Sequence, residues 1–148
     1  MKLLGIFLFL GTTSVFAGDL SGRWRNSQDG TVVNFIKING SYKQHSSARY
    51  NYPGGRLAYT IDQAISIPVS DDSWQEGEVA FFDSRGCSFK NLPVTVEFQS
   101  SRKVNFLLTV PRYKFQTITT GERFRPRSVR HTCRVLEYVE VPVELIRY

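Results

Sequence analysis

A stretch rich in arginine near the C-terminal end has the clearest potential for ligand chemistry. Residues 122–134 contain five arginines with a single phenylalanine among them. Guanidinium groups bind phosphates, carboxylates and anionic lipid headgroups through paired hydrogen bonds. We therefore expect Arg125, Arg127 and Arg130 to contact the anionic group of a ligand. The alternative is a long solvated loop before the last strand.

A second candidate contact is Trp74, which lies within an acidic stretch. Residues 71–78 include four carboxylates, but they lack the spacing of a calcium-binding loop. We expect a solvated acidic loop, with Trp74 either tucked beneath it or offered to a partner.

The sequence carries none of the usual signatures of catalysis. His45 and His131 have no His-Glu-x-x-His or Cys-x-x-Cys partner, and no Gly-x-Ser-x-Gly motif is present. We expect a protein that is not an enzyme and that uses no metal and no cofactor.

The first residues have the pattern of a signal peptide. Lys2 precedes an apolar run over residues 3–10, and Val15-Phe16-Ala17 supplies a small residue for cleavage. The run is about half of the ~20 residues that a membrane-spanning helix needs. We expect residues 1–17 to be removed and residues 18–148 to form one exported domain, periplasmic or secreted. That domain has 18 basic and 13 acidic residues, a net charge of +5.

The chain has two cysteines, Cys87 and Cys133. In an exported protein a single pair predicts one disulfide bond, because no other connectivity exists.

The remaining pattern predicts an all-β fold with about 8–10 strands. The strongest local signal is a hairpin made of residues 31–38 and 41–46, because Asn39-Gly40 tolerates the positive φ angles of a two-residue turn. Apolar and polar residues alternate in other segments, which predicts half-buried strands. These segments are residues 57–61, 78–84, 87–89, 94–98, 104–110, 113–119 and 134–147. Because an open sheet of this length would leave exposed edges, we expect an antiparallel up-and-down barrel.

The two ends of the domain predict how that barrel closes. Trp24 shares a parity with Leu20, and Arg147 shares a parity with the four aliphatic residues Val139, Val141, Val143 and Leu145. Both side chains should therefore face the interior. A guanidinium on an indole face is favourable by roughly 0.5–2 kcal/mol, so we expect Trp24 and Arg147 to plug one end of the barrel.

In these end residues the sequence resembles the calycin group of β-barrels, which includes the lipocalins and the avidins. Gly22-Arg23-Trp24 matches the Gly-x-Trp motif of the first strand, and Arg147 matches the arginine of the last strand. The likeness to avidins implies that Asn26 contacts a ligand. The resemblance as a whole implies a barrel that encloses a small molecule.

These observations predict an exported, non-enzymatic protein that holds a small apolar or amphipathic ligand, neutral or anionic, in a β-barrel. If Arg147 lies at the closed end, residues 123–131 should lie at the opposite, open end, where they would meet an acidic head. The alternative is an interaction protein, such as an inhibitor of an exported hydrolase or an envelope factor, which binds a macromolecule through its loops. We do not expect nucleic acid as a partner.

Overall fold

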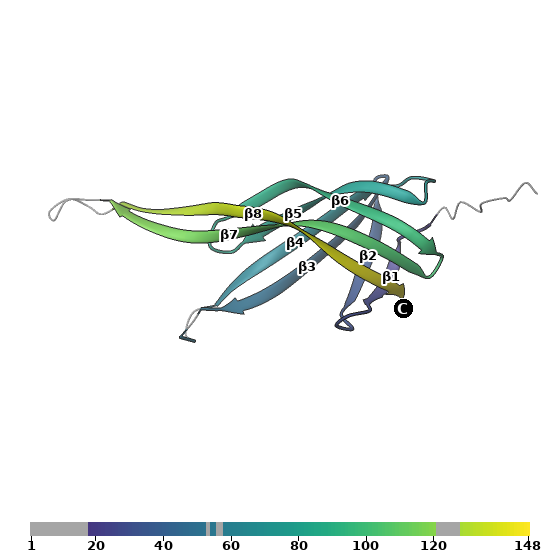
Figure 1. Cartoon of the computed structure of the whole chain (residues 1–148), viewed down its shortest axis with the longest axis horizontal. Helices are drawn as coiled ribbons and strands as arrows, with labels where there is room; N and C mark the ends of the chain where they lie inside the picture. Colours follow the sequence, from purple (N-terminus) through teal and green to yellow (C-terminus); the bar gives the residue numbers. More distant parts are fainter. Residues whose placement is uncertain (1–17, 53, 56–57, 121–127) are drawn as a thin grey trace, which may run out of the picture.

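The computed structural model describes residues 18–52, 54–55, 58–120 and 128–148. The predicted cleavage site, Arg125 and Arg127 lie outside these residues. All regular structure in the described part is β-strand (Figure 1). The strands are β1 (Gly22–Asn26), β2 (Val32–Ile38), β3 (Ser41–Asn51), β4 (Ala58–Pro68), β5 (Trp74–Asp83), β6 (Ser88–Ser100), β7 (Lys103–Thr120) and β8 (Ser128–Arg147).

The eight strands form a closed antiparallel barrel in which each strand pairs with its neighbours in sequence. The predicted fold class is therefore confirmed. Asn39 and Gly40 have φ angles of 50° and 77°, as the predicted hairpin turn between β2 and β3 requires. The ring closes between β1 and β8, where Trp24 lies opposite Arg147.

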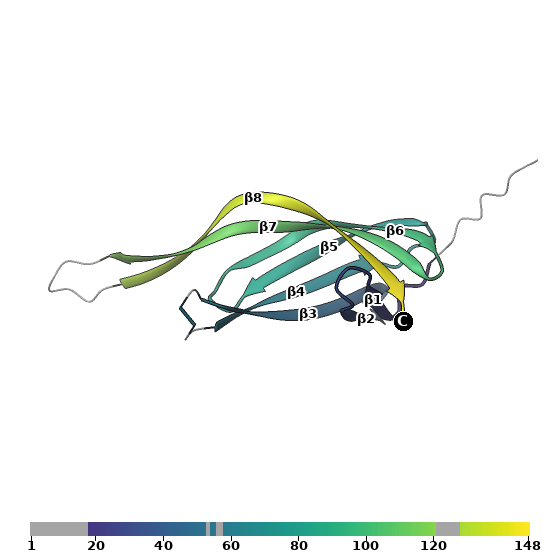
Figure 2. The same ribbon diagram turned by 60° about the horizontal axis from the view of Figure 1, so that its bottom comes forward.

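The strands differ greatly in length, so the ring is complete only near one end. β1 has 5 residues, whereas β8 has 20. β1 pairs with β8 only through residues 24–26, and β2 pairs with β3 only through residues 36–38. Toward the other end the β3–β4 and β7–β8 hairpins diverge, and β7–β8 extends beyond the other strands (Figures 1 and 2). We call the two ends the closed end and the open end.

Several expected segment boundaries were wrong. Residues 74–78, expected within an acidic loop, are the start of β5, and residues 88–89 and 94–98, expected as separate strands, belong to the single strand β6. Residues 113–119 are the continuation of β7, which passes through Pro111 without a break. Proline is tolerated there because Leu108, which pairs with Val94, is the last residue of β7 that pairs with β6. Residues 128–133, which were not expected to belong to a strand, are the start of β8.

The closed end is filled by side chains. Buried apolar residues from every strand meet there and around the middle of the barrel, as the alternation of the sequence predicts. The most deeply buried are Leu20, Trp24, Ile67, Val79, Val94, Val96 and Val104.

Trp24 and Arg147 form the predicted plug. The guanidinium carbon of Arg147 lies 4.1 Å from the ring centroid of Trp24. The same guanidinium donates hydrogen bonds to the carbonyl oxygens of Asp19 and Ser21, and the indole Nε1 of Trp24 donates to the carbonyl of Leu20 at 2.8 Å. The segment before β1 is thereby tied across the closed end.

The interior face of β8 is covered only close to that plug. Leu145 is buried and Val143 is half-buried, but Val139 and Val141 are 39% and 36% exposed. The expectation that all four aliphatic residues lie in the core was wrong for these two, because β1 is too short to cover them.

The predicted disulfide bond between Cys87 and Cys133 is present, with a Cα–Cα distance of 5.9 Å. It links the turn that follows β5 to β8, two segments that are 46 residues apart in sequence. We call residues 113–120 and 128–135 the arm, and the disulfide joins the arm to the barrel.

Candidate ligand site

The interior of the barrel is hollow toward the open end. One hollow of about 370 Å³ is lined by β3, β4, β5 and β7, and an adjoining hollow of about 250 Å³ reaches down to β1 and β8. Both are bordered by Thr31, Ser46 and Gln63. We refer to the two together as the inner hollow. Its size is within the range that holds small ligands.

The lining of the inner hollow is amphipathic. Its lower part is apolar, with Phe35 and Phe106 stacked at 5.5 Å between ring centroids and Leu108 beside them. Neutral polar groups line the opposite wall, where Gln44 and Gln63 present their side chains from β3 and β4. Such a lining can bury an apolar group and offer hydrogen bonds to a polar one.

Asn26, which the resemblance to avidins singled out, lies in this lining. Its backbone and side chain also shape the turn after β1, because its carboxamide oxygen accepts a hydrogen bond from the backbone N–H of Gln28. The turn brings Asp29 and Thr31 to the same wall.

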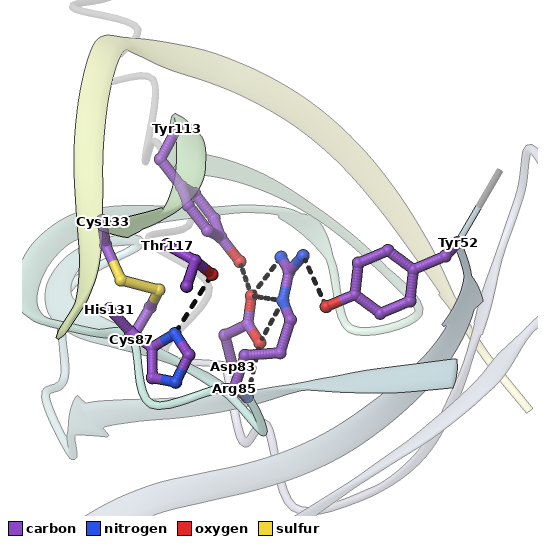
Figure 3. The surroundings of a disulfide bond; sticks show 8 residues. All are labelled: Tyr52, Asp83, Arg85, Cys87, Tyr113, Thr117, His131 and Cys133. Atoms are coloured by element: carbon purple, nitrogen blue, oxygen red, sulfur yellow. Dashed lines mark hydrogen bonds and ion pairs between the residues drawn. A yellow bond between two sulfur atoms is a disulfide. The ribbon is translucent and has the colours of Figure 1, made fainter. Parts of the chain in front are cut away.

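A cluster of polar side chains lies beside the disulfide, toward the open end (Figure 3). Asp83, at the end of β5, accepts hydrogen bonds from Arg85 Nε and Nη2 and from the hydroxyl of Tyr113, the last at 2.5 Å. Arg85 reaches further to the hydroxyl of Tyr52 at 3.4 Å. Since Tyr113 also lines the inner hollow, the cluster fixes one wall of the candidate site.

The electrostatics of this cluster are those of a satisfied buried ion pair. Burial alone would raise the pKa of Asp83, but the hydrogen bonds from Arg85 and Tyr113 outweigh it and lower that pKa below its ordinary value. Hydrogen bonding to Asp83 raises the pKa of Arg85, and burial raises the pKa of Tyr113. The pair stays charged and Tyr113 stays neutral, so we assign the cluster a structural role.

Aromatic rings enclose the guanidinium of Arg85. Its carbon lies 3.7 Å from the ring centroid of Tyr59 and 4.4 Å from that of Phe115, and His131 stacks on Phe115. His131 and Thr117 also contact each other across the arm beside the disulfide (Figure 3). The base of the arm is therefore packed against the turn that contains Arg85.

Of the predicted ligand contacts, Arg130 and Trp74 lie within the described residues, and the structure does not bring these two together. Arg130 is exposed on β8, where it pairs with Ile118 far along the arm. Trp74 is 52% exposed at the start of β5 and pairs with Glu97 near the closed end. Residues 123–131 were expected at the open end, and Arg130 lies there. However, Arg130 is on the arm and does not line the inner hollow.

The sequence interpretation missed the residues that shape the site. Arg85 was read only as part of a turn, and Asp83 and Tyr113 were read only as strand residues. The one available signal was the Asp83-Ser84-Arg85-Gly86 stretch, which combines a turn with a carboxylate and a guanidinium two residues apart.

Another hollow, of about 600 Å³, lies on the outer surface, over β3, β4 and β5. Its floor is made by the small side chains of Ala64 and Ala80, and Ile36, Lys43 and Lys90 stand around it. Among the described residues no group of histidine, cysteine, aspartate and glutamate is arranged to hold a metal ion. The same part of the chain has no helix that is long and apolar enough to cross a membrane.

Comparison of the chain with protein-family models, with curated proteins and with solved structures finds no match. The likeness to calycins therefore depends on the architecture and on the end residues. The closed eight-stranded up-and-down barrel, plugged by Trp24 and Arg147, is compatible with a calycin-like fold.

Proposed function

We propose that the chain is an exported, non-enzymatic binding protein that takes an apolar or amphipathic ligand into the inner hollow. The observation that carries this proposal is the amphipathic hollow above a filled closed end. A barrel of eight strands is near the size at which side chains alone fill the interior. Here they fill one end and leave space at the other.

The lining favours a ligand with a neutral polar group. No lysine or arginine is among the described residues that line the inner hollow, whereas Gln44, Gln63 and Ser46 are. An acidic head would instead need a cationic contact from outside this lining, such as Arg130 on the arm; Arg125 and Arg127, also predicted as contacts, lie outside the described residues. We therefore place the apolar part of the ligand against Phe35, Phe106 and Leu108, and its polar part against the two glutamines.

The binding of N-phenyl-1-naphthylamine, a neutral amphipathic dye that fluoresces in apolar surroundings, tests this proposal. Leu108→Trp fills the hollow, and we expect it to weaken saturable binding at least ten-fold. Leu107→Trp is the matched control, because Leu107 is the next residue on β7 and is 36% exposed on the outer face. Circular dichroism confirms that each variant is folded.

Equal weakening by the two variants would show that the dye binds elsewhere. The anionic dye 8-anilinonaphthalene-1-sulfonate separates the two versions of the ligand. Tighter binding of that dye, lost on replacing Arg130, would favour the acidic head over the neutral one.

The arm favours a second function, that of an interaction protein. It projects beyond the barrel (Figure 1) and carries the exposed residues Arg130 and Arg134 together with Ile118, which is 45% exposed. Such a surface suits an anionic macromolecule, for which we expect binding to weaken steeply with salt. Arg130→Glu should then abolish capture of that partner and leave dye binding unchanged.

A further inference from the structure

The inner hollow lies beside a strand edge that has no partner. β2 pairs with β3 only as far as Lys43, while β3 continues to Asn51. In the described part of the chain, no other strand pairs with residues 44–51 on that side. We call residues 44–51 the free edge of β3.

The hairpin turn determines which backbone groups are unpaired. Residues that flank a two-residue turn exchange hydrogen bonds, so the backbone of Ser41 faces β2. Backbone direction alternates along a strand. The N–H and C=O groups of His45, Ser47 and Arg49 therefore point away from β4, toward the open side.

The side chains of the free edge point alternately into the barrel and out of it. Ser46 and Ala48 line the inner hollow, whereas His45 and Arg49 are exposed on the outside. A strand added here would send alternate side chains into the hollow, whose two parts lie one after the other along β3. Its other side chains would lie on the outside, beside His45 and Arg49.

We propose that the free edge of β3 binds an extended peptide segment of another protein, by strand addition. The inference rests on the proposed function, because the apolar side chains of the peptide would occupy the inner hollow. Main-chain hydrogen bonds supply affinity in this mode of recognition, and pockets for alternate side chains supply specificity. The ligand class is therefore an extended segment in which apolar residues alternate with polar ones.

The positive charge beside the free edge of β3 indicates which residues the peptide carries at its outward, polar positions. Lys43, His45 and Arg49 are exposed along the outer side of β3. Within the described residues neither Lys43 nor Arg49 forms an ion pair. We therefore assign acidic residues to the outward positions of the peptide.

The other open edge of the barrel, on β8, is protected against strand addition. Pro142 lacks an N–H, Glu137 and Glu140 carry charge, and the register with β7 shifts beside Leu136. Prolines, charges and bulges are the features by which sheet edges resist added strands. Residues 44–51 of β3 contain no proline, and their register with β4 is unbroken.

The test uses a fluorescent, acetylated and amidated peptide of alternating valine and glutamate, followed by anisotropy with the whole mature protein. Two N-methylated versions separate the backbone from the side chains. In a peptide that runs antiparallel to β3 the outward glutamates lie opposite His45, Ser47 and Arg49 and exchange hydrogen bonds with them. N-methylation of the glutamates then removes the donors that face β3, and we expect at least ten-fold weaker binding. N-methylation of the valines alters groups that face away, and we expect binding within two-fold of the parent peptide.

Variants of the edge give the matching result on the protein side. Ser47→Pro removes one N–H from the free edge, a place where proline is tolerated, and we expect at least ten-fold weaker binding. Ser47→Ala is the control, because it also loses the hydrogen bond from the Ser47 hydroxyl to Asp62 but keeps the backbone donor. Should Ser47→Pro fail to fold, the two methylated peptides decide the question with the unaltered protein.

The possible outcomes are distinguishable. Saturable binding of the neutral dye without any peptide binding up to millimolar concentration would overturn the inference and leave the proposed function standing. Binding of neither would overturn both. Sedimentation could instead show that the protein self-associates and that Ser47→Pro abolishes the self-association. That result would assign the free edge to a second copy of the chain and would overturn the inference that it binds a peptide.

Discussion

Replacing Arg85 with alanine should destabilise the protein more than any other loss of a single ion pair in the described chain. The side chain of Asp83 is 1% exposed and that of Arg85 is 17% exposed, with 2.6 Å between Nη2 and the carboxylate. Without Arg85 the buried carboxylate keeps only the Tyr113 hydroxyl and its own turn as donors. Breaking a buried pair from one side costs about 3–5 kcal/mol, and lost stacking on Tyr59 adds to the upper part of that range.

The matched control is Arg112→Ala. Arg112 pairs with Glu137 at 2.8 Å, but the two side chains are 68% and 52% exposed. Exposed pairs contribute about 0–1 kcal/mol. The loss of unfolding free energy, measured by urea unfolding and tryptophan fluorescence, should therefore be clearly larger for Arg85→Ala than for Arg112→Ala. Equal losses of unfolding free energy would refute the structural role of the Asp83 cluster.

The pH dependence of the unfolding free energy tests the role of Arg85 independently. In the unaltered protein the pKa of Asp83 is lowered, so its contribution to stability is present above the ordinary aspartate pKa and is lost as the pH falls below about 4. In Arg85→Ala we expect burial, the largest single influence on Asp83, to outweigh the remaining hydrogen bonds and to raise the pKa of Asp83 above that ordinary value. Protonation then stabilises the variant as the pH falls from neutral toward 4, so the difference in stability between the two proteins should narrow. A difference that stays constant or widens would contradict this account.

Three further predictions test the closed end and the arm. Trp24→Ala should cost about 3–5 kcal/mol as a core lesion, and its effect should be strongly non-additive with that of Arg147→Ala in urea unfolding, because each removes the other's partner. Mass analysis without reductant should find no alkylatable thiol at Cys87 or Cys133. Loss of the bond should cost up to about 4 kcal/mol for a loop of this length, and two free thiols in the native protein would contradict the pairing. Tyr113→Phe should cost about 1–3 kcal/mol, because it removes one donor from a buried carboxylate, and unchanged thermal stability would contradict that hydrogen bond.

The features that the sequence predicts correctly depend on local patterns or on the chain ends. Asn39-Gly40 specifies its turn within two residues, and the period of two identifies most strands. Trp24 and Arg147 could be paired because parity placed both inside, and because a barrel must join its first strand to its last. The unbroken register at Pro142 kept that parity intact.

The cluster around Asp83 could not be predicted in the same way. Its members come from the turn after β3, from β5, from the turn that follows β5, and from β7. Their meeting depends on how the base of the arm packs against the turn after β5, and nothing in the spacing of Tyr52 or Tyr113 shows it. The arm was missed for a related reason, since arginines and a proline over residues 122–134 are typical of a solvated loop.

Strand length explains both the hollow and the free edge. Closing a sheet into a barrel removes its edges only where every strand is present. β1 ends at Asn26 and β2 begins at Val32, so above their turn the ring lacks two strands between β8 and β3. The space left inside is the inner hollow, and the backbone left unpaired beside it is the free edge of β3. A proline and a shift of register lie on the edge of β8 and not on residues 44–51 of β3. An incompletely closed barrel whose second open edge has neither of these two features is the arrangement expected where another strand adds to the sheet.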